Sequence, residues 1–305
     1  MKRTNFFLCA AAITLALFAL GSCASVMGSG VKVNAFDTLD HDSLVYISVP
    51  VGVHSEFTNS LLKSFIGNDV SDKYIKNVAD SIDRVYVGIG NSSNRKRLQA
   101  ACDGTVSTAS KLALSSNEYF SKKIQNVNTT GLYQVYTEKK SGVQICAPGS
   151  GLILLGSDIT PQLERYDSEA NAQIVSSVLS ESNSNGLEWK ESEVYKFVGD
   201  SSTDNIRLYM NKPLSFITNL LGTSLSSSIF QLNFIEGEFE KLPSGKYSVD
   251  LNMEFSKDNL ITKAVTFLRV ALLMTDSKVT ASDERHLSVT GIQVSLDQMK
   301  KMLGI

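Results

Sequence analysis

The chain has 305 residues, of which 43% are hydrophobic and 20% charged, and its formal net charge at pH 7 is −2. That length suffices for one large domain or for two domains of ordinary size. A mildly acidic chain without a basic run offers no electrostatic footprint for nucleic acid, so nucleic-acid binding is not expected.

The chain begins with a basic and then apolar leader. Lys2 and Arg3 precede an uncharged run over residues 6–20, which is too short and wrongly flanked for a membrane-spanning helix. Leu20-Gly21-Ser22-Cys23 closes the run and resembles the lipobox of bacterial lipoproteins. The resemblance implies a signal peptide over residues 1–22 and a lipid, including palmitate-type acyl chains, on the Cys23 thiol. The alternative is an ordinary secretory signal in which Cys23 is incidental.

Lipidation would define where the protein works. Two or three acyl chains form a stable membrane anchor, whereas one chain holds a protein only marginally. Ala24, not aspartate, follows Cys23, and resemblance to the sorting rule of diderm lipoproteins then favours the outer membrane over the inner one. Residues 23–42 are polar, contain glycine and lack periodicity, so we expect a flexible tether between the lipid and the folded part.

The first half of the folded part, residues 43–168, predicts an N-terminal α+β module. Apolar periodicity predicts strands at 44–49, 84–89, 96–103 and 132–137, and helices at 57–66, 72–82 and 107–124. An extra hairpin is expected at 142–156, where Pro148 and Gly149 mark the turn, and a short helix near Pro161. A Ser/Asn-rich linker is expected over residues 169–204.

The second half, residues 205–305, predicts the same order of elements. Strands are expected at 206–210, 230–239, 246–255 and 287–294, and helices at 213–221 and 257–274. Both halves therefore have the order β-α-β-β-α-β, which resembles the ferredoxin-like split fold. We expect an α+β protein of two similar modules with mainly antiparallel sheets.

Motifs for catalysis or metal binding are incomplete. His54, with Glu56 two residues on, lies after the first predicted strand, where a site or simply a solvated loop is expected. Ser60 and Lys63 match an S-x-x-K pattern, but Ser60 lies inside a predicted helix and the companion motifs are missing. No catalytic, cofactor-binding or metal-binding residue is therefore assigned.

Two surface patterns are candidates for binding. Glu236, Glu238 and Glu240 alternate along a predicted strand, where they bind a cation or a basic partner, or else form the solvated face or blunted edge of that strand. Strand alternation places Tyr46, Tyr86 and Tyr136 on an open sheet face that is suitable for a protein partner, unless their rings pack against the hairpin or the other half. The same face of the second half is more polar and shows Arg207, Tyr209, Gln231, Asn233, Asp250 and Asn252.

The remaining cysteines, Cys102 and Cys146, are predicted not to form a disulfide. Alternation points Cys102 into the core and Cys146 to the opposite face, on a strand too distant for a bridge.

The sequence thus predicts a lipid-anchored envelope protein that works by binding or scaffolding, with the membrane and a protein as partners. It resembles uncharacterised envelope lipoproteins of spirochaetes and other diderm bacteria. The alternatives are an envelope hydrolase with a dispersed site, or an accessory subunit of an assembly or transport complex.

Overall fold

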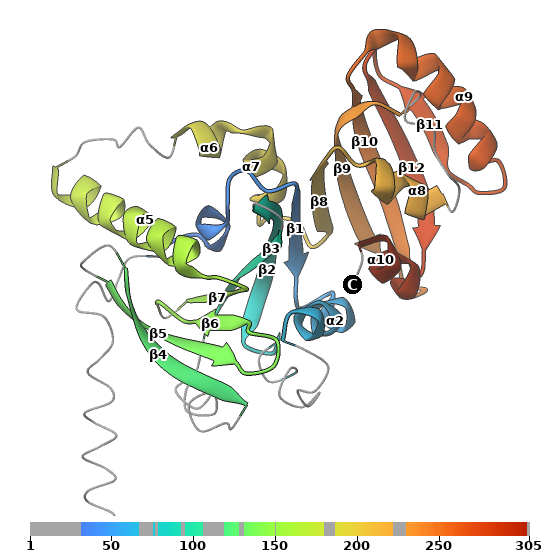
Figure 1. The fold of residues 1–305 in the computed structure, drawn as a ribbon. Coiled ribbons are helices and arrows are strands. Elements are labelled where there is room, and N and C mark those ends of the chain that lie inside the picture. The colour runs from blue at the N-terminus through green and yellow to red at the C-terminus, as the bar shows by residue number, and fades with distance from the viewer. Residues whose placement is uncertain are drawn as a thin grey trace, which may run out of the picture.

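The computed structural model describes residues 32–66, 76, 79–92, 95–105, 119–127, 131–149, 151–179, 187–221 and 230–303. Within these ranges, twelve strands form one sheet in the order β11-β12-β10-β9-β8-β1-β2-β3-β7-β6-β5-β4. All of its strand pairings are antiparallel. Figure 1 shows the sheet opening into two lobes, one with β1–β7 and the other with β8–β12.

The strands of the first lobe are β1 (Val45–Pro50), β2 (Ile82–Ser92), β3 (Arg95–Gly104), β4 (Phe120–Val127), β5 (Gly131–Glu138), β6 (Gln144–Cys146) and β7 (Leu152–Gly156). Those of the second lobe are β8 (Ile206–Asn211), β9 (Leu232–Lys241), β10 (Tyr247–Phe255), β11 (Lys278–Ala281) and β12 (His286–Val294).

The described helices are η1 (Ala35–Thr38), α2 (Ser55–Ile66), α5 (Thr160–Leu179), α6 (Leu187–Glu191), α7 (Glu193–Val198), α8 (Leu214–Leu221), η3 (Asp258–Leu260), α9 (Ile261–Ala271) and α10 (Leu296–Leu303). None of the helices in the described ranges is both long and apolar enough to cross a membrane.

The two faces of the sheet are covered differently. On the first face α2, α8, α9 and α10 bury one apolar cluster that runs through both lobes, with Phe57, Phe216, Leu268 and Met299 as helix contributions. On the second face η1, α5, α6 and α7 bury a separate cluster that is centred on the first lobe. Among the described residues, the second face of β9, β10 and β12 has no helical layer of its own.

Strand β10 shows why the sequence pattern was informative. Five alternating residues, Tyr247, Val249, Leu251, Met253 and Phe255, are all buried, while the residues between them are half-buried or exposed. Burying each large apolar side chain contributes about 1.5–3 kcal/mol, so this alternation defines the inward face of the strand. The prediction for this strand is confirmed.

The ferredoxin-like topology is not confirmed. In that fold the first two strands of a module are parallel and separated by a third, whereas here β1 pairs directly with β2, and β8 directly with β9, both antiparallel. Pro50, at the end of β1, lies opposite Arg84, so the connection that contains α2 leaves and re-enters at the same end of the sheet. Element order alone does not determine whether a helical connection crosses the sheet or returns.

A repeat of a different kind is present. Both lobes contain strand, helix and two strands that lie side by side, as β1-α2-β2-β3 and as β8-α8-β9-β10. In both lobes a later hairpin, β6-β7 or β11-β12, pairs its second strand with the third strand of the lobe. Strand β7 thus pairs with β3, and β12 with β10. Strands β1 and β8 pair with each other, so one sheet continues through both halves. The division into two modules stays a prediction.

Three predicted segments differ from the structure. Residues 120–124, expected at the end of a helix, belong to strand β4, because they pair with β5; residues 106–118 lie outside the described part. Ile82, expected to end a helix, begins β2. The expected short helix near Pro161 is the 20-residue α5. The extra hairpin is confirmed as β6 and β7.

The predicted linker, residues 169–204, contains the end of α5 and the whole of α6 and α7. Ser192, whose residue type contributed to the linker prediction, is the N-cap of α7, and its Oγ accepts a hydrogen bond from the backbone N–H of Tyr195 at 3.2 Å. Val198 at the end of α7 is buried in the second cluster. This segment therefore builds the fold, apart from residues 180–186, which are outside the described part.

The predicted tether is also partly folded. Residues 32–42, called here the N-terminal strap, cross the second face of the sheet, and Phe36 and Leu39 are fully buried there. Asn34 caps η1 by accepting a hydrogen bond from the Phe36 N–H at 2.9 Å. Two large apolar side chains suffice to hold a segment that is otherwise polar in composition.

Cys102 and Cys146 are not joined in a disulfide, as predicted, and both side chains are buried. Cys102 belongs to the first cluster and Cys146 to the second, so the two thiols lie on opposite faces of the sheet. Strand β7 separates their strands β3 and β6. The expected reason for the missing bond is therefore confirmed, with one intervening strand instead of the two expected.

Candidate functional site

The tyrosine face predicted for a partner is not exposed. Tyr46 and Tyr86 do lie on the same sheet face, but each is only 1% exposed, because the N-terminal strap covers them. The ring of Phe36 packs 5.8 Å from Tyr46 and 5.3 Å from Tyr86, and burial raises the pKa of both tyrosines to about 12. Tyr136 is buried in the cluster on the opposite face. These three residues are structural.

His54 is likewise buried and not in a solvated loop. Its Nε2 lies 2.7 Å from the backbone carbonyl of Asp204, and its Nδ1 lies 3.4 Å from the Tyr247 hydroxyl. Burial lowers the pKa of the imidazole. Ser60, the other catalytic candidate, donates its hydroxyl to the Glu56 carbonyl within α2. The His54 side chain thus contacts two distant segments of the chain, and the Ser60 hydroxyl bonds within its own helix.

Cys23 lies outside the described residues, so its lipidation remains a prediction. The described chain begins at Lys32, whose carbonyl accepts a hydrogen bond from Nε2 of Gln173 on α5 at 3.4 Å. The chain therefore enters the fold beside α5, in the first lobe (Figure 1).

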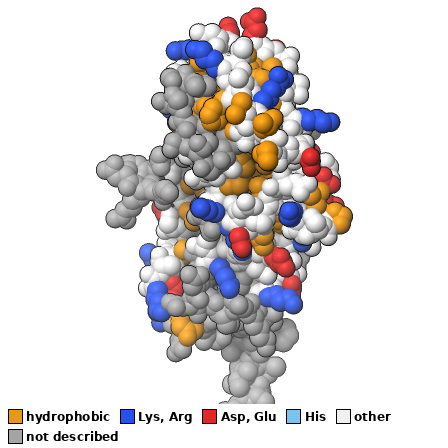
Figure 2. Space-filling view, turned by 90° about the vertical axis from the view of Figure 1, so that its right-hand side faces the viewer, with side chains coloured by type: hydrophobic (Ala, Val, Ile, Leu, Met, Phe, Trp, Pro, Cys, Tyr) orange, Lys and Arg blue, Asp and Glu red, His pale blue; other side chains and the backbone are white. Residues whose placement is uncertain are grey.

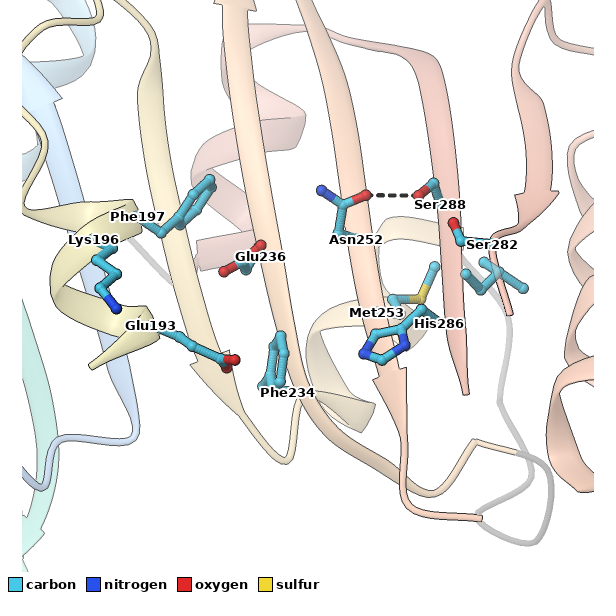
Figure 3. A pocket seen from close by; sticks show the side chains of 11 residues that line it. Glu193, Lys196, Phe197, Phe234, Glu236, Asn252, Met253, Ser282, His286 and Ser288 are labelled. Atoms are coloured by element: carbon cyan, nitrogen blue, oxygen red, sulfur yellow. Dashed lines mark hydrogen bonds between the residues drawn. The ribbon is translucent and has the colours of Figure 1, made fainter. Parts of the chain in front are cut away.

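An open groove of about 550 Å³ lies on the second face of the C-terminal lobe. Helix α7 forms one wall, strands β9 and β10 the floor, and the start of β12 the other wall (Figure 3). Its volume is within the range of ligand sites in proteins. The lining residues are Glu193, Lys196, Phe197, Phe234, Glu236, Asn252, Met253, Ser282, His286, Leu287 and Ser288.

The floor contains the glutamate pattern found in the sequence. Phe234 and Glu236 share one face of β9 with Glu238 and Glu240, while Ile235 and Phe239 on the other face are buried. Because β9 lies between β8 and β10, these glutamates are in the middle of the sheet and do not blunt an edge. The edge-strand interpretation is therefore wrong.

Phe234 is held in place by a neighbouring ring. Tyr209 on β8 stacks on it with ring centroids 5.2 Å apart and an interplanar angle of 18°. Phe234 also lines the groove, and Figure 3 shows the Glu193 carboxylate pointing toward its ring from α7. Burial, and then the negative charge of Glu193, raise the pKa of Glu236.

Arg207 lies beside the groove, and its charge is paired with two carboxylates. Its guanidinium lies 5.1 Å from the centroid of the Phe197 ring and forms ion pairs with Asp200 at 2.8 Å and Glu238 at 3.5 Å. Hydrogen bonds from Ser202, together with Arg207, lower the pKa of Asp200 to about 2.

The β10 side of the floor and the β12 wall offer neutral hydrogen-bonding groups. The Ser288 hydroxyl donates to Asn252 Oδ1 at 2.7 Å, which leaves the Asn252 amide free to donate. Glu254, next to this wall, is neutralised by Arg285 at 2.8 Å. Among the described residues, no group of three or more histidine, cysteine or acidic side chains is arranged to hold a metal ion.

Sequence reasoning found part of this site. It placed Arg207, Tyr209, Asp250 and Asn252 on the open face and noted the glutamates of β9. It missed Glu193, Lys196 and Phe197, because α7 was expected to be linker. The only local signal for α7 is Ser192 followed by an acid and an apolar residue, a pattern typical of a helix start.

A mixed helix and sheet chain with an antiparallel sheet, a lipobox-like leader and an open groove defines an envelope lipoprotein with a folded body. The chain belongs to the family of the outer membrane-associated lipoprotein TP0453, whose family model matches residues 30–300. TP0453 is a lipoprotein of a spirochaete, and membership in its family places this protein among lipoproteins of the cell envelope.

Solved structures of TP0453 have the same fold. Crystal form I matches with a TM-score of 0.62 and covers 90% of this chain and 97% of its own. Crystal forms IV and III match with TM-scores of 0.60 and 0.59, and all three are 13% identical to this chain. At that identity the likeness shows the fold alone. A comparison with curated proteins found no match.

Proposed function

We propose that this outer-membrane lipoprotein is anchored through a lipid on Cys23 and works by binding a partner in the groove of its C-terminal lobe. The observation that supports binding is the groove itself, an open sheet face with a stacked aromatic ring, two carboxylates and neutral hydrogen-bonding groups. An open, shallow surface of this kind suits recognition of another molecule.

The described chain begins in the first lobe, whereas the groove lies on the second lobe. Only residues 24–31 separate Cys23 from Lys32, and an extended chain of about nine residues reaches about 30 Å. A lipid on Cys23 would therefore keep the first lobe close to the bilayer, while the groove is carried by the second lobe. This arrangement leaves the groove accessible to a partner at the envelope.

The proposal is tested by filling the groove. Asn252→Trp places a large ring in the groove, and Gln293→Trp places the same ring at an exposed site on β12 outside it. The full lipidated chain is purified from membranes without a substitution, with Asn252→Trp and with Gln293→Trp, and the molecules that co-purify with each protein are identified by mass spectrometry. We expect some molecules to co-purify with the unsubstituted chain and with the Gln293→Trp variant but not with the Asn252→Trp variant. Identical sets from all versions would contradict the proposal.

A second function is favoured by exposed apolar residues in the last turn of α9 and in the turn that follows it. Val270, Leu273 and Met274 are 70%, 77% and 96% exposed, and Figure 2, which faces the side formed by α9, shows hydrophobic side chains gathered in its upper half. Apolar groups at a helix end can enter the boundary between lipid headgroups and acyl chains.

This membrane contact is independent of the lipid anchor. The full chain with Cys23→Ser should float with lipid vesicles, and adding Leu273→Ser and Met274→Ser should reduce flotation. Leu132→Ser, which changes another exposed leucine on β5, is the control. If the Leu273→Ser and Met274→Ser substitutions reduce flotation no more than Leu132→Ser does, the end of α9 has no role in membrane contact.

A further inference from the structure

Three residues of the groove form what we call the acidic socket: Glu193 on α7, and Phe234 and Glu236 on β9. Figure 3 shows the Glu193 carboxylate next to the Phe234 ring, with Glu236 on the same side of the strand. The two carboxylates are close enough for the charge of Glu193 to affect the ionisation of Glu236. The socket therefore combines an aromatic surface with two negative charges.

The two carboxylates of the socket form no ion pair within the described part of the chain, and the charge of Arg207 only partly offsets the effect of burial and of Glu193 on the pKa of Glu236. Neither Glu193 nor Glu236 forms an ion pair or a hydrogen bond with another described side chain, whereas Glu238 pairs with Arg207 and Glu254 pairs with Arg285. Lys196 also lines the groove but makes no ion pair with either glutamate. Two like charges placed side by side repel, and an added cation would relieve that repulsion.

The neighbouring Arg207 shows which cation fits such a site. Its guanidinium packs on the Phe197 ring and is shared between two carboxylates, Asp200 and Glu238. The acidic socket repeats this composition, with Phe234 in place of the ring and Glu193 and Glu236 in place of the carboxylates. A planar guanidinium stacks on aromatic rings and binds carboxylates in a fork, which a compact ammonium group does less well.

We propose that the acidic socket binds the guanidinium group of an arginine side chain from a partner protein. This inference rests on the proposed binding function and specifies its chemistry. The groove also offers partners for the backbone that carries the arginine, because Asn252, Ser282 and Ser288 line it and provide donors and acceptors for peptide groups. The partner would thus present an exposed, arginine-containing segment at the envelope.

The test uses the full lipidated chain in phosphatidylcholine nanodiscs, which do not attract cations by their own charge. Binding of the peptide acetyl-Arg-Gly-Arg-amide is measured by calorimetry and compared with the peptide in which both arginines are citrulline. Citrulline keeps the shape of the side chain and removes the charge. We expect the citrulline peptide to bind roughly tenfold more weakly than the arginine peptide. A peptide in which lysine replaces both arginines should bind with an affinity between these two.

Variants of the protein locate the binding site. Glu193→Gln with Glu236→Gln should weaken the arginine peptide by roughly tenfold. Glu240→Gln is the matched control, because Glu240 lies on the same face of β9 but outside the groove, and it should change binding by less than about twofold. Equal binding of the arginine and citrulline peptides, or equal effects of the two sets of variants, would overturn the proposal.

The two proposals fail in different ways. If the arginine peptide does not bind but Asn252→Trp still loses its co-purified components, the groove binds a partner and the arginine assignment is wrong. If the peptide does not bind and Asn252→Trp also retains every component, both proposals are wrong.

Discussion

His54 is expected to make the fold sensitive to acid, because it joins parts of the chain that are far apart. It follows β1 and contacts the Asp204 carbonyl, before β8, and Tyr247 on β10. A carbonyl only accepts, so Nε2 of His54 must carry the proton that it donates over 2.7 Å. In the neutral ring Nδ1 then accepts from the Tyr247 hydroxyl.

The magnitude of the perturbation follows from these contacts. His54→Ala removes the short hydrogen bond to the Asp204 carbonyl, worth about 1 kcal/mol, together with the 3.4 Å contact to the Tyr247 hydroxyl. It also deletes a buried ring that stacks 5.6 Å from Tyr247, which costs about 2–4 kcal/mol more. The free energy of unfolding should therefore fall by about 3–5 kcal/mol, measured by urea unfolding of the full chain with Cys23→Ser at about pH 7.5.

The pH dependence has a defined sign. Burial holds the pKa of folded His54 below the value of about 6.5 that it has in an unfolded chain. Below about pH 6.5 the unfolded chain binds a proton that the folded chain does not, so the free energy of unfolding falls as the pH decreases toward the folded pKa. His54→Gln keeps a side-chain donor but does not titrate.

The stability difference between the chain with His54 and the His54→Gln variant should therefore shrink between about pH 7 and about pH 5. All other titrating groups are the same in the two proteins, so their contributions to the pH dependence cancel in this difference. A difference that stays constant over this range would refute the argument.

Three further predictions concern other parts of the chain. Cys23→Ser should move the protein from the detergent phase to the aqueous phase of Triton X-114, and a variant that stays in the detergent phase would contradict the proposed anchor. Phe36→Ala should lower the free energy of unfolding by about 3–5 kcal/mol, because Phe36 is fully buried among four aromatic rings; a loss below about 1 kcal/mol would show that the N-terminal strap is not part of the core. Burial raises the pKa of the Cys102 thiol, so Cys102 should react slowly with thiol reagents in the folded chain. Denaturation without reduction should expose both Cys102 and Cys146 to labelling. A mass deficit of about two daltons that reduction restores would show a disulfide instead.

Strands with one buried face could be predicted from the sequence, because alternation is a local signal. β10 is an example, whereas the hairpin of β6 and β7 was predicted from the turn residues Pro148 and Gly149. The order of the strands in the sheet could not be predicted. The strand that follows a helical connection can lie on either side of the strand before it, and only tertiary packing determines which side it takes. Short helices such as α7 were missed because serine and asparagine are typical of both linkers and helix caps.

The groove was only half predictable for the same reason. Glu236 and its neighbours on β9 share a face by strand geometry, which the sequence reveals. Glu193 reaches that face from a helix some forty residues away, and a single sequence carries no signal of that proximity. The tyrosine pattern misled in the opposite way: alternation correctly placed Tyr46 and Tyr86 on one face, but the strap that covers them was expected to be tether.

The position of the groove follows from the different chemistry of the two lobes. In the first lobe the second face of the sheet bears Tyr46, Tyr86 and Leu154, which gain free energy when η1, α5 and α6 cover them. In the second lobe the corresponding face bears glutamates and amides, and burying unpaired carboxylates would cost several kcal/mol each. A second helical layer is therefore favourable on one lobe and unfavourable on the other. Helix α7 lies where that layer ends, and its outer side forms the wall of a face that remains open to a partner.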